Sequence, residues 1–285
     1  MKKAGKKRGK STLVVALLLL AGLCVLAYPF VSDRIATRAH VAAVVDYQNG
    51  VKALPTQEEK RLLQQARDYN ARLGGTAVED PFTQGSQPDT EYEDQLSVGG
   101  VMGSIQIPEI GVDLPIYHGT SDQTLAKGVG HLYGTSLPVG GAGTHAVLTG
   151  HRGLPSATLF TDLDKLKEGD RFYIEVLDET LAYQVDQIKV VEPTDTTALQ
   201  IEPGKDYVTL LTCTPYGINS HRLLVRGARV EMPPQQAKQE VQTVLAQPGF
   251  LQQWWWLLLL AAAAVAVALL LLRRRVKKHK QKRGV

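Results

Sequence analysis

The spacing of apolar residues divides this chain into three regions. Two runs, Leu13 to Val31 and Trp254 to Leu272, are nineteen residues long and apolar on every side of a helix. At about 1.5 Å per helical residue, each run is just long enough to cross a hydrocarbon core of about 30 Å. We therefore expect a membrane-spanning helix near each end. Trp254, Trp255 and Trp256 lie where an interfacial aromatic belt is expected.

Helical periodicity continues after the first run, from Asp33 to Leu73. Pro55 interrupts it, which predicts two helices instead of one. Thr56 and Glu59 have the spacing of a capping box, with Thr56 as the N-cap residue. The next stretch, Gly75 to Ser97, is rich in Gly, Pro, Asp, Thr and Ser and predicts a long surface loop.

From Val101 onward the pattern changes to short β-prone runs with turn residues between them. The predicted strands are Val101–Ile107, Val112–Tyr117, His145–Leu148, Arg171–Val176, Leu181–Val191, Tyr207–Thr212 and Arg222–Glu231. A helix-spaced apolar face also predicts a short helix over Ala157 to Leu166. Many short strands of this kind indicate a β-barrel or a β-sandwich. About 130 residues are sufficient for one independent core.

Charge is distributed very unevenly along the chain. Six basic residues precede the first apolar run and eight follow the second, which predicts that both termini are cytoplasmic and the middle of the chain is outside. The middle region then has 18 basic and 28 acidic residues, a balance of −10, which argues against nucleic-acid binding. Val25 and Ala27 form an acceptable signal-peptidase site, so cleavage of the first run is an alternative.

A lone cysteine, Cys213, is the principal candidate for chemistry. The other cysteine, Cys24, lies in the first apolar run, so Cys213 has no disulfide partner in the outer region. A nucleophilic thiolate needs an acid/base group and a positive charge, and His151 and Arg222 are available for these roles. A buried, inert cysteine is the alternative. His145, His221, Arg152 and Arg226 are the weaker candidates for the same roles.

The segments LLTCTPYGINSHRLLVRG and THAVLTGHRGL resemble those of the sortases, cysteine transpeptidases of the Gram-positive cell surface. The resemblance extends over about Val101 to Glu231 and is greatest to the pilin-polymerising class C branch. It implies a mainly β fold with an eight-stranded barrel, with Cys213 as nucleophile, His151 as acid/base and Arg222 as charge stabiliser. It also implies partners, namely pilin subunits with LPXTG-like sorting signals and acceptor lysines.

A second resemblance lies in Glu79-Asp80-Pro81-Phe82, ahead of the predicted strands. Pilin-type sortases have an Asp-Pro-aromatic loop that covers the active site as a lid. If this chain has the same lid, Asp80 would pair with Arg222 and Phe82 would cover Cys213. The alternative is that Asp-Pro is an ordinary turn dipeptide. Dispersed histidines predict no metal site, and we expect no cofactor.

These observations predict a membrane-anchored pilin sortase, with membrane lipid as a further partner and no nucleic acid. Three alternatives remain: a sortase that attaches proteins to peptidoglycan, a hydrolytic thiol peptidase, and a non-catalytic membrane-tethered scaffold. The predicted organisation is a basic tail with the first membrane segment (1–31), a helical region (32–75), a lid loop (76–98), the catalytic barrel (99–234), a linker (235–253), the second membrane helix (254–272) and a basic tail (273–285).

Overall fold

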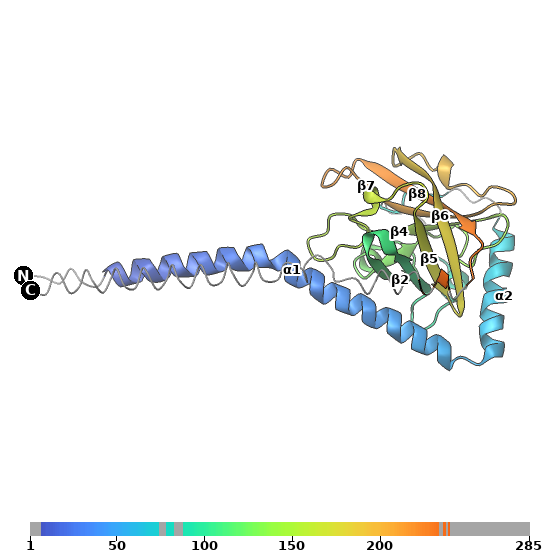
Figure 1. The fold of residues 1–285 in the computed structure, drawn as a ribbon, viewed down its shortest axis with the longest axis horizontal. Helices are drawn as coiled ribbons and strands as arrows, with labels where there is room; N and C mark the ends of the chain where they lie inside the picture. Colours follow the sequence, from blue (N-terminus) through green and yellow to red (C-terminus); the bar gives the residue numbers. More distant parts are fainter. Residues whose placement is uncertain (1–6, 74–77, 83–87, 234–235, 238, 240–285) are drawn as a thin grey trace, which may run out of the picture. The chain divides into compact units, whose positions relative to one another are not determined.

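A computed structural model describes residues 7–73, 78–82, 88–233, 236–237 and 239 of the chain. Two helices come first, α1 (Lys7–Ala53) and α2 (Thr56–Arg72), and two short ones follow, α3 (Thr90–Glu93) and α4 (Asp122–Leu125). The strands are β1 (Gly103–Ile107), β2 (Val112–His118), β3 (Val129–His131), β4 (Thr144–Thr149), β5 (Arg171–Val176), β6 (Glu179–Val191), β7 (Asp206–Thr214) and β8 (His221–Val230) (Figure 1).

The eight strands form a closed barrel in the order β1-β2-β3-β4-β7-β8-β6-β5, so the predicted fold class is confirmed. The pairs β2–β3 and β4–β7 are parallel, and the other pairs are antiparallel. Seven strands match the predicted runs. The periodicity did not predict β3, because three residues are too few to show an alternation.

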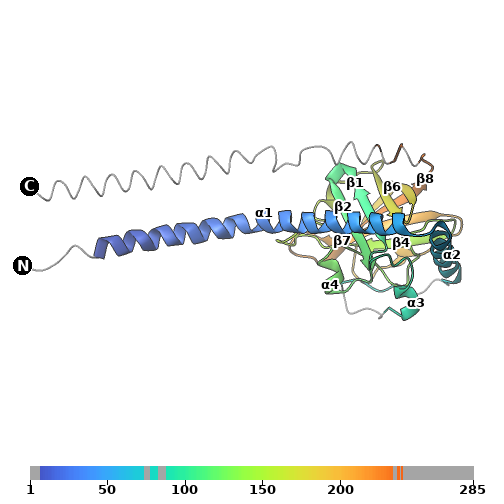
Figure 2. The same cartoon turned by 90° about the horizontal axis from the view of Figure 1, so that it is seen from below.

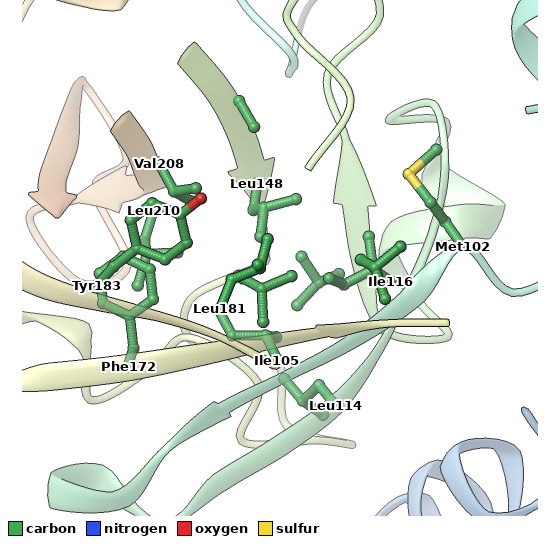
Figure 3. Close-up of a cluster of buried hydrophobic side chains, with 14 of the residues drawn as sticks. Met102, Ile105, Leu114, Ile116, Leu148, Phe172, Leu181, Tyr183, Val208 and Leu210 are labelled. Atoms are coloured by element: carbon green, nitrogen blue, oxygen red, sulfur yellow. The ribbon is translucent and has the colours of Figure 1, made fainter. Parts of the chain in front are cut away.

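Alternating side chains of the strands fill the barrel. Figure 3 shows Ile105, Ile116, Leu148, Leu181 and Leu210 meeting in its interior. The Phe172 and Tyr183 rings stack at 5.6 Å in the same core. Packing is tight beside them: a Cβ on Gly227 would lie 2.5 Å from the Phe172 ring, so β8 needs glycine at this position.

The N-terminal helices break where the sequence predicts, but the predicted capping box does not form. Pro55 is itself the N-cap residue of α2, and its carbonyl accepts hydrogen bonds from the backbone N–H groups of Glu58 and Glu59. Thr56 is already inside the helix, and no side chain caps its start. Proline's fixed φ suits the extended conformation of an N-cap, with φ −60° and ψ 138° here, and shifts the cap by one residue.

Two other local predictions were wrong. The stretch after Gly75 is not a surface loop throughout, because Tyr92 and Leu96 are fully buried beside the short helix α3. The expected helix over Ala157 to Leu166 is mostly turns, with a single 3-10 turn at Leu163–Lys165. Its apolar side chains are buried as expected, yet Leu159 has a φ of +43°, which a continuous α-helix excludes.

Helix α1 runs through Pro29 and packs across β1 and β2 (Figure 2). Tyr47 attaches it to the barrel, since its buried hydroxyl accepts a hydrogen bond from the Leu177 N–H at 2.7 Å and donates to the Met102 carbonyl at 3.3 Å. Gln48 adds a hydrogen bond to Glu175 at 3.0 Å. The helix that contains the first apolar run is therefore also part of the folded domain.

In the described part of the chain, one helical stretch, Leu18–Ala53, is long and apolar enough to cross a membrane. A signal sequence near the N-terminus would pass the same test of length and composition, so this finding fits both interpretations of the first run. The second predicted membrane helix, Trp254 to Leu272, and the basic tail after it lie outside the described residues.

We predict that Tyr47→Phe lowers the free energy of unfolding by about 1–3 kcal/mol, because it leaves the buried Leu177 N–H without its acceptor. Tyr117→Phe is the matched control, since the described residues offer its half-buried hydroxyl no hydrogen bond. Denaturant unfolding followed by circular dichroism measures both. Equal losses in the two variants would contradict the role of Tyr47.

Candidate active site

One outer face of the barrel carries the candidate site. Along β4, β7 and β8, side chains alternate between the main core and a second apolar cluster formed by Val147, Leu211 and Leu224. Val78, which precedes Asp80, packs into this second cluster. Leu199, from the segment between β6 and β7, packs there as well. The cluster is thus an apolar surface that is covered by the chain's own segments.

Cys213 and Arg222 face each other across this surface. They are paired in the antiparallel register of β7 and β8. Directly opposed residues in such a pair have Cβ atoms about 4.5–5.5 Å apart. Cys213 has the parity of Leu211 and Arg222 that of Leu224, so both point to the side of the apolar cluster. Both are nearly buried, with 8% and 7% of their surface exposed.

His151 follows the end of β4, in a turn held against β7. The Gly150 N–H donates to the Leu211 carbonyl at 3.1 Å, and the Thr212 hydroxyl donates to the Gly150 carbonyl at 2.7 Å. A Cβ on Gly150 would lie 2.7 Å from the Phe160 ring, which requires glycine before the histidine. The parallel pairing of β4 with β7 thus places His151 at the strand end that carries Cys213.

The segment with Asp80 and Phe82 lies directly on these groups. The Asp80 carboxylate accepts two hydrogen bonds from the Arg222 guanidinium, at 2.6 Å from Nε and 2.7 Å from Nη2. The Phe82 ring is 5.6 Å from the His151 ring, and the central guanidinium carbon of Arg222 lies 5.0 Å from its centroid. One short segment therefore contacts both His151 and Arg222.

Burial and charge set the protonation of the candidate nucleophile. Burial raises the pKa of the Cys213 thiol, the Arg222 charge lowers it, and the Asp80 carboxylate raises it again. For His151, burial lowers the pKa, while the carboxylate of Asp122 in α4 raises it. The arrangement therefore favours a neutral thiol and a neutral imidazole while Asp80 and Phe82 are in place.

The weaker candidates lie in other environments. His145 is buried and hydrogen-bonded to the Gln200 carbonyl and the Thr209 hydroxyl. His221 is partly exposed and pairs with Glu192 at 3.1 Å. Arg226 binds Asp186 and Glu202 and lies over the Tyr207 ring. Arg152 has only 8% of its side chain exposed and donates to the Thr214 hydroxyl, next to Cys213.

Sequence reasoning missed three residues of this site. Thr212 fixes the turn before His151, Asp122 places a carboxylate near that imidazole, and Val78 covers the apolar surface. Of the three, only Thr212 could have been noticed in the sequence, because it is a polar residue inside an apolar strand. Among the described residues, no group of three or more His, Cys, Asp and Glu side chains is arranged to hold a metal ion.

A thiol, an imidazole and a guanidinium at one rim can carry out acyl transfer. The thiolate forms the covalent intermediate, the imidazole moves protons, and the guanidinium donates hydrogen bonds to an oxyanion. Arginine stays protonated at working pH, so it acts as a charge stabiliser.

Comparison with known proteins gives a consistent result. The Sortase domain model matches residues 105–230. A crystal structure of sortase C from Streptococcus pneumoniae is 49% identical, with a TM-score of 0.64, and the match covers 67% of this chain and 97% of that one. Sortase A of Bacillus anthracis is 30% identical over 186 residues, 64% of this chain and 84% of that protein. Sortase D of Bacillus subtilis is 31% identical over 135 residues, which is 46% of this chain and just under two thirds, 65%, of that protein.

We predict that Asp80→Asn increases the rate of Cys213 alkylation by iodoacetamide at pH 7 by about threefold or more, because it removes a charge that disfavours the thiolate. The rate is measured by intact-protein mass spectrometry over time. Asp94→Asn, an exposed acid outside the site, is the matched control. Equal rates in both variants would show that Asp80 does not influence the thiol.

Removal of the Phe82 ring should change the pKa of His151. We expect Phe82→Ala to raise the pKa of His151 toward that of an exposed histidine, because water reaches the imidazole and burial no longer lowers the pKa. An NMR titration of the histidine ring protons measures the change. His145 is the internal control, since its burial does not involve Phe82. An unchanged His151 titration would contradict this account.

Proposed function

Because the chain belongs to the sortase family of cysteine transpeptidases, we propose that it joins pilin subunits through isopeptide bonds at the outer face of the cell membrane. The single observation that carries the proposal is the Cys213–Arg222 register with His151 beside it on the same rim. Such an arrangement fits acyl transfer through a thioester. The substrate would be an LPXTG-like sorting signal.

In the first half-reaction, the Cys213 thiolate attacks the carbonyl carbon of the Thr–Gly amide. Arg222 donates hydrogen bonds to the oxyanion of the tetrahedral intermediate. His151 in its protonated form gives a proton to the departing glycine amine as the C–N bond breaks. The products are a threonyl thioester on Cys213 and a free C-terminal fragment.

In the second half-reaction, a lysine side-chain amine of another pilin subunit attacks the thioester. His151 takes the proton from this amine, and the Cys213 thiolate leaves. The new bond is an isopeptide bond, and the enzyme returns to its starting state.

The closed arrangement of Asp80 and Phe82 represents an inactive state in this proposal. Asp80 occupies Nε and Nη2 of Arg222, while Nη1 donates to the carbonyls of Asn219 and His221. The guanidinium thus donates four hydrogen bonds, and its edge with Nε and Nη2 cannot bind an oxyanion until Asp80 leaves. Opening of the 78–82 segment would expose Cys213, His151 and the apolar surface together.

Membrane anchoring is the second part of the proposal. The first apolar run in α1 and the basic residues that precede this run favour an N-terminal anchor with the barrel outside the cytoplasm. The second apolar run would provide another anchor. Pilin subunits, as the proposed partners, would then meet the enzyme at the membrane surface.

The pilin branch is favoured over attachment to peptidoglycan by two observations. Asp80 binds Arg222, as in the lid that the pilin-type resemblance implies, and Phe82 lies against His151 and Arg222. The sortase C of Streptococcus pneumoniae, described for its pilin substrate specificity, is similar over 67% of this chain.

We predict that the full chain in detergent micelles, with Asp80→Ala and Phe82→Ala, forms a covalent adduct with a Leu-Pro-x-Thr-Gly peptide. Intact-protein mass spectrometry should show an added mass equal to the peptide cut after threonine. The adduct should be absent when Cys213→Ala is added. A folded enzyme that forms no adduct with this peptide or with a library of pilin tails would overturn the assignment of Cys213.

Product analysis then separates the alternatives. A pilin segment with an acceptor lysine should give a branched isopeptide product, whereas a peptidoglycan stem peptide as the better acceptor would indicate wall anchoring. Release of free acid in the presence of both amines would indicate a thiol peptidase. Pilus assembly that continues in a strain carrying Cys213→Ala would indicate a scaffold.

A further inference from the structure

Two uncharged loops lie next to each other at the catalytic rim. One is Gly153–Thr158, which follows His151, and the other is Pro215–Ser220, which joins β7 to β8 and appears in orange in Figure 1. Tyr216 packs over Gly153, where an added Cβ would lie 3.0 Å from its ring. These loops contain no acidic or basic residue, although the predicted outer region has a charge balance of −10.

The second loop exposes large apolar side chains to solvent. Tyr216 is 61% exposed and Ile218 is 72% exposed. Among the described residues after α1, only Ile188 and Val190 are also exposed large hydrophobics, and they flank Lys189 on β6. Exposed aliphatic and aromatic side chains within an uncharged loop are typical of a surface that meets a partner.

The first of these loops, Gly153–Thr158, adjoins the outer end of the apolar helix. The first apolar run ends at Val31, and the next two residues contact the loop after His151. The Asp33 carboxylate accepts hydrogen bonds from the Thr158 N–H and hydroxyl, at 2.8 and 2.7 Å. The Ser32 hydroxyl lies 3.1 Å from the Pro155 carbonyl. Tyr28 and Phe30, both exposed, occupy the last turn of the run, where interfacial aromatics are expected.

We propose that Pro215–Ser220 is a second membrane contact of this protein, with Tyr216 and Ile218 inserted in the interface of the phospholipid bilayer beside α1. The proposal rests on the proposed membrane anchoring through α1. Interfaces accept aromatic and aliphatic side chains with uncharged neighbours, and the composition of both loops meets this requirement.

The contact would determine where the catalytic rim lies relative to the lipid. Arg222 donates to the carbonyls of Asn219 and His221, so the inserted loop is bonded directly to a site residue. Through Gly153, Tyr216 also touches the turn that carries His151. A substrate tethered in the same membrane would then present its cleavage site close to the bilayer surface.

The test uses the full chain in phosphatidylcholine vesicles, with Cys24→Ser and Cys213→Ala to remove the native thiols. A single cysteine is introduced by Ile218→Cys and labelled with an environment-sensitive fluorophore. Val190→Cys is the matched control, since Val190 is a similarly exposed aliphatic residue on β6. We expect doxyl-lipid quenching and a blue-shifted emission at 218, and neither at 190. Equal behaviour of the two labels, with full access of iodide from water, would overturn the proposal.

A second measurement separates lipid binding from substrate binding. In the otherwise catalytically intact chain opened by Asp80→Ala and Phe82→Ala, Ile218→Ser should raise the KM for a vesicle-anchored Leu-Pro-x-Thr-Gly peptide by about fivefold and leave soluble-peptide cleavage unchanged. Val190→Ser should change neither. An equal loss with both peptides would assign the loop to the sorting signal instead. Failure of the proposed function would appear as no cleavage in any variant, while the labelling result would stand independently.

Discussion

The pairing of β7 with β8 is the constraint on which the candidate site depends. In this antiparallel register Cys213 is opposite Arg222, and both side chains lie on the face that carries Leu211 and Leu224. A shift of one residue in either strand would turn one of them into the barrel core. The closed barrel makes such a shift costly, because each strand is held by a neighbour on both sides.

Arg222 links three parts of the structure. It is paired with Cys213 across the strands, it receives Asp80 from a segment more than a hundred residues earlier, and it holds the loop between β7 and β8. A buried guanidinium needs such partners, because an unpaired charge in this environment is unfavourable. In the proposed function, water or substrate would replace Asp80 when the 78–82 segment leaves. The same interaction would then keep the site closed and still be reversible.

Helix α1 connects the candidate site to the long apolar run near the N-terminus. Tyr47 binds it to the barrel, and Asp33 and Ser32 bind it to the loop after His151. These contacts involve both ends of the part of α1 that follows the apolar run. They make the apolar helix a structural element of the catalytic domain, so the orientation of the rim is coupled to the direction of the helix.

Much of the barrel could be predicted from the sequence, since alternation is a local property. Seven strands appeared as short β-prone runs, while the three residues of β3 gave no such signal. Local sequence patterns did not predict burial where contacts with other segments of the chain determine it. The Tyr92 ring packs into the main core and its hydroxyl is bound by His131 and the Gly119 N–H, which a stretch rich in turn residues cannot indicate.

Cys213, His151 and Arg222 could be singled out in the sequence, because a thiol without a disulfide partner calls for an acid/base group and a positive charge nearby. That they meet was implied only by the resemblance to the sortases, since 62 residues of chain separate Cys213 from His151 and no local pattern relates them. That proximity arises from the parallel pairing of β4 with β7. The contacts of Asp80 and Phe82 likewise depend on how the 78–82 segment crosses the barrel face. Sequence alone determined the chemistry and the strand pattern, and the tertiary structure decided which groups meet, because these contacts join segments that no local periodicity relates.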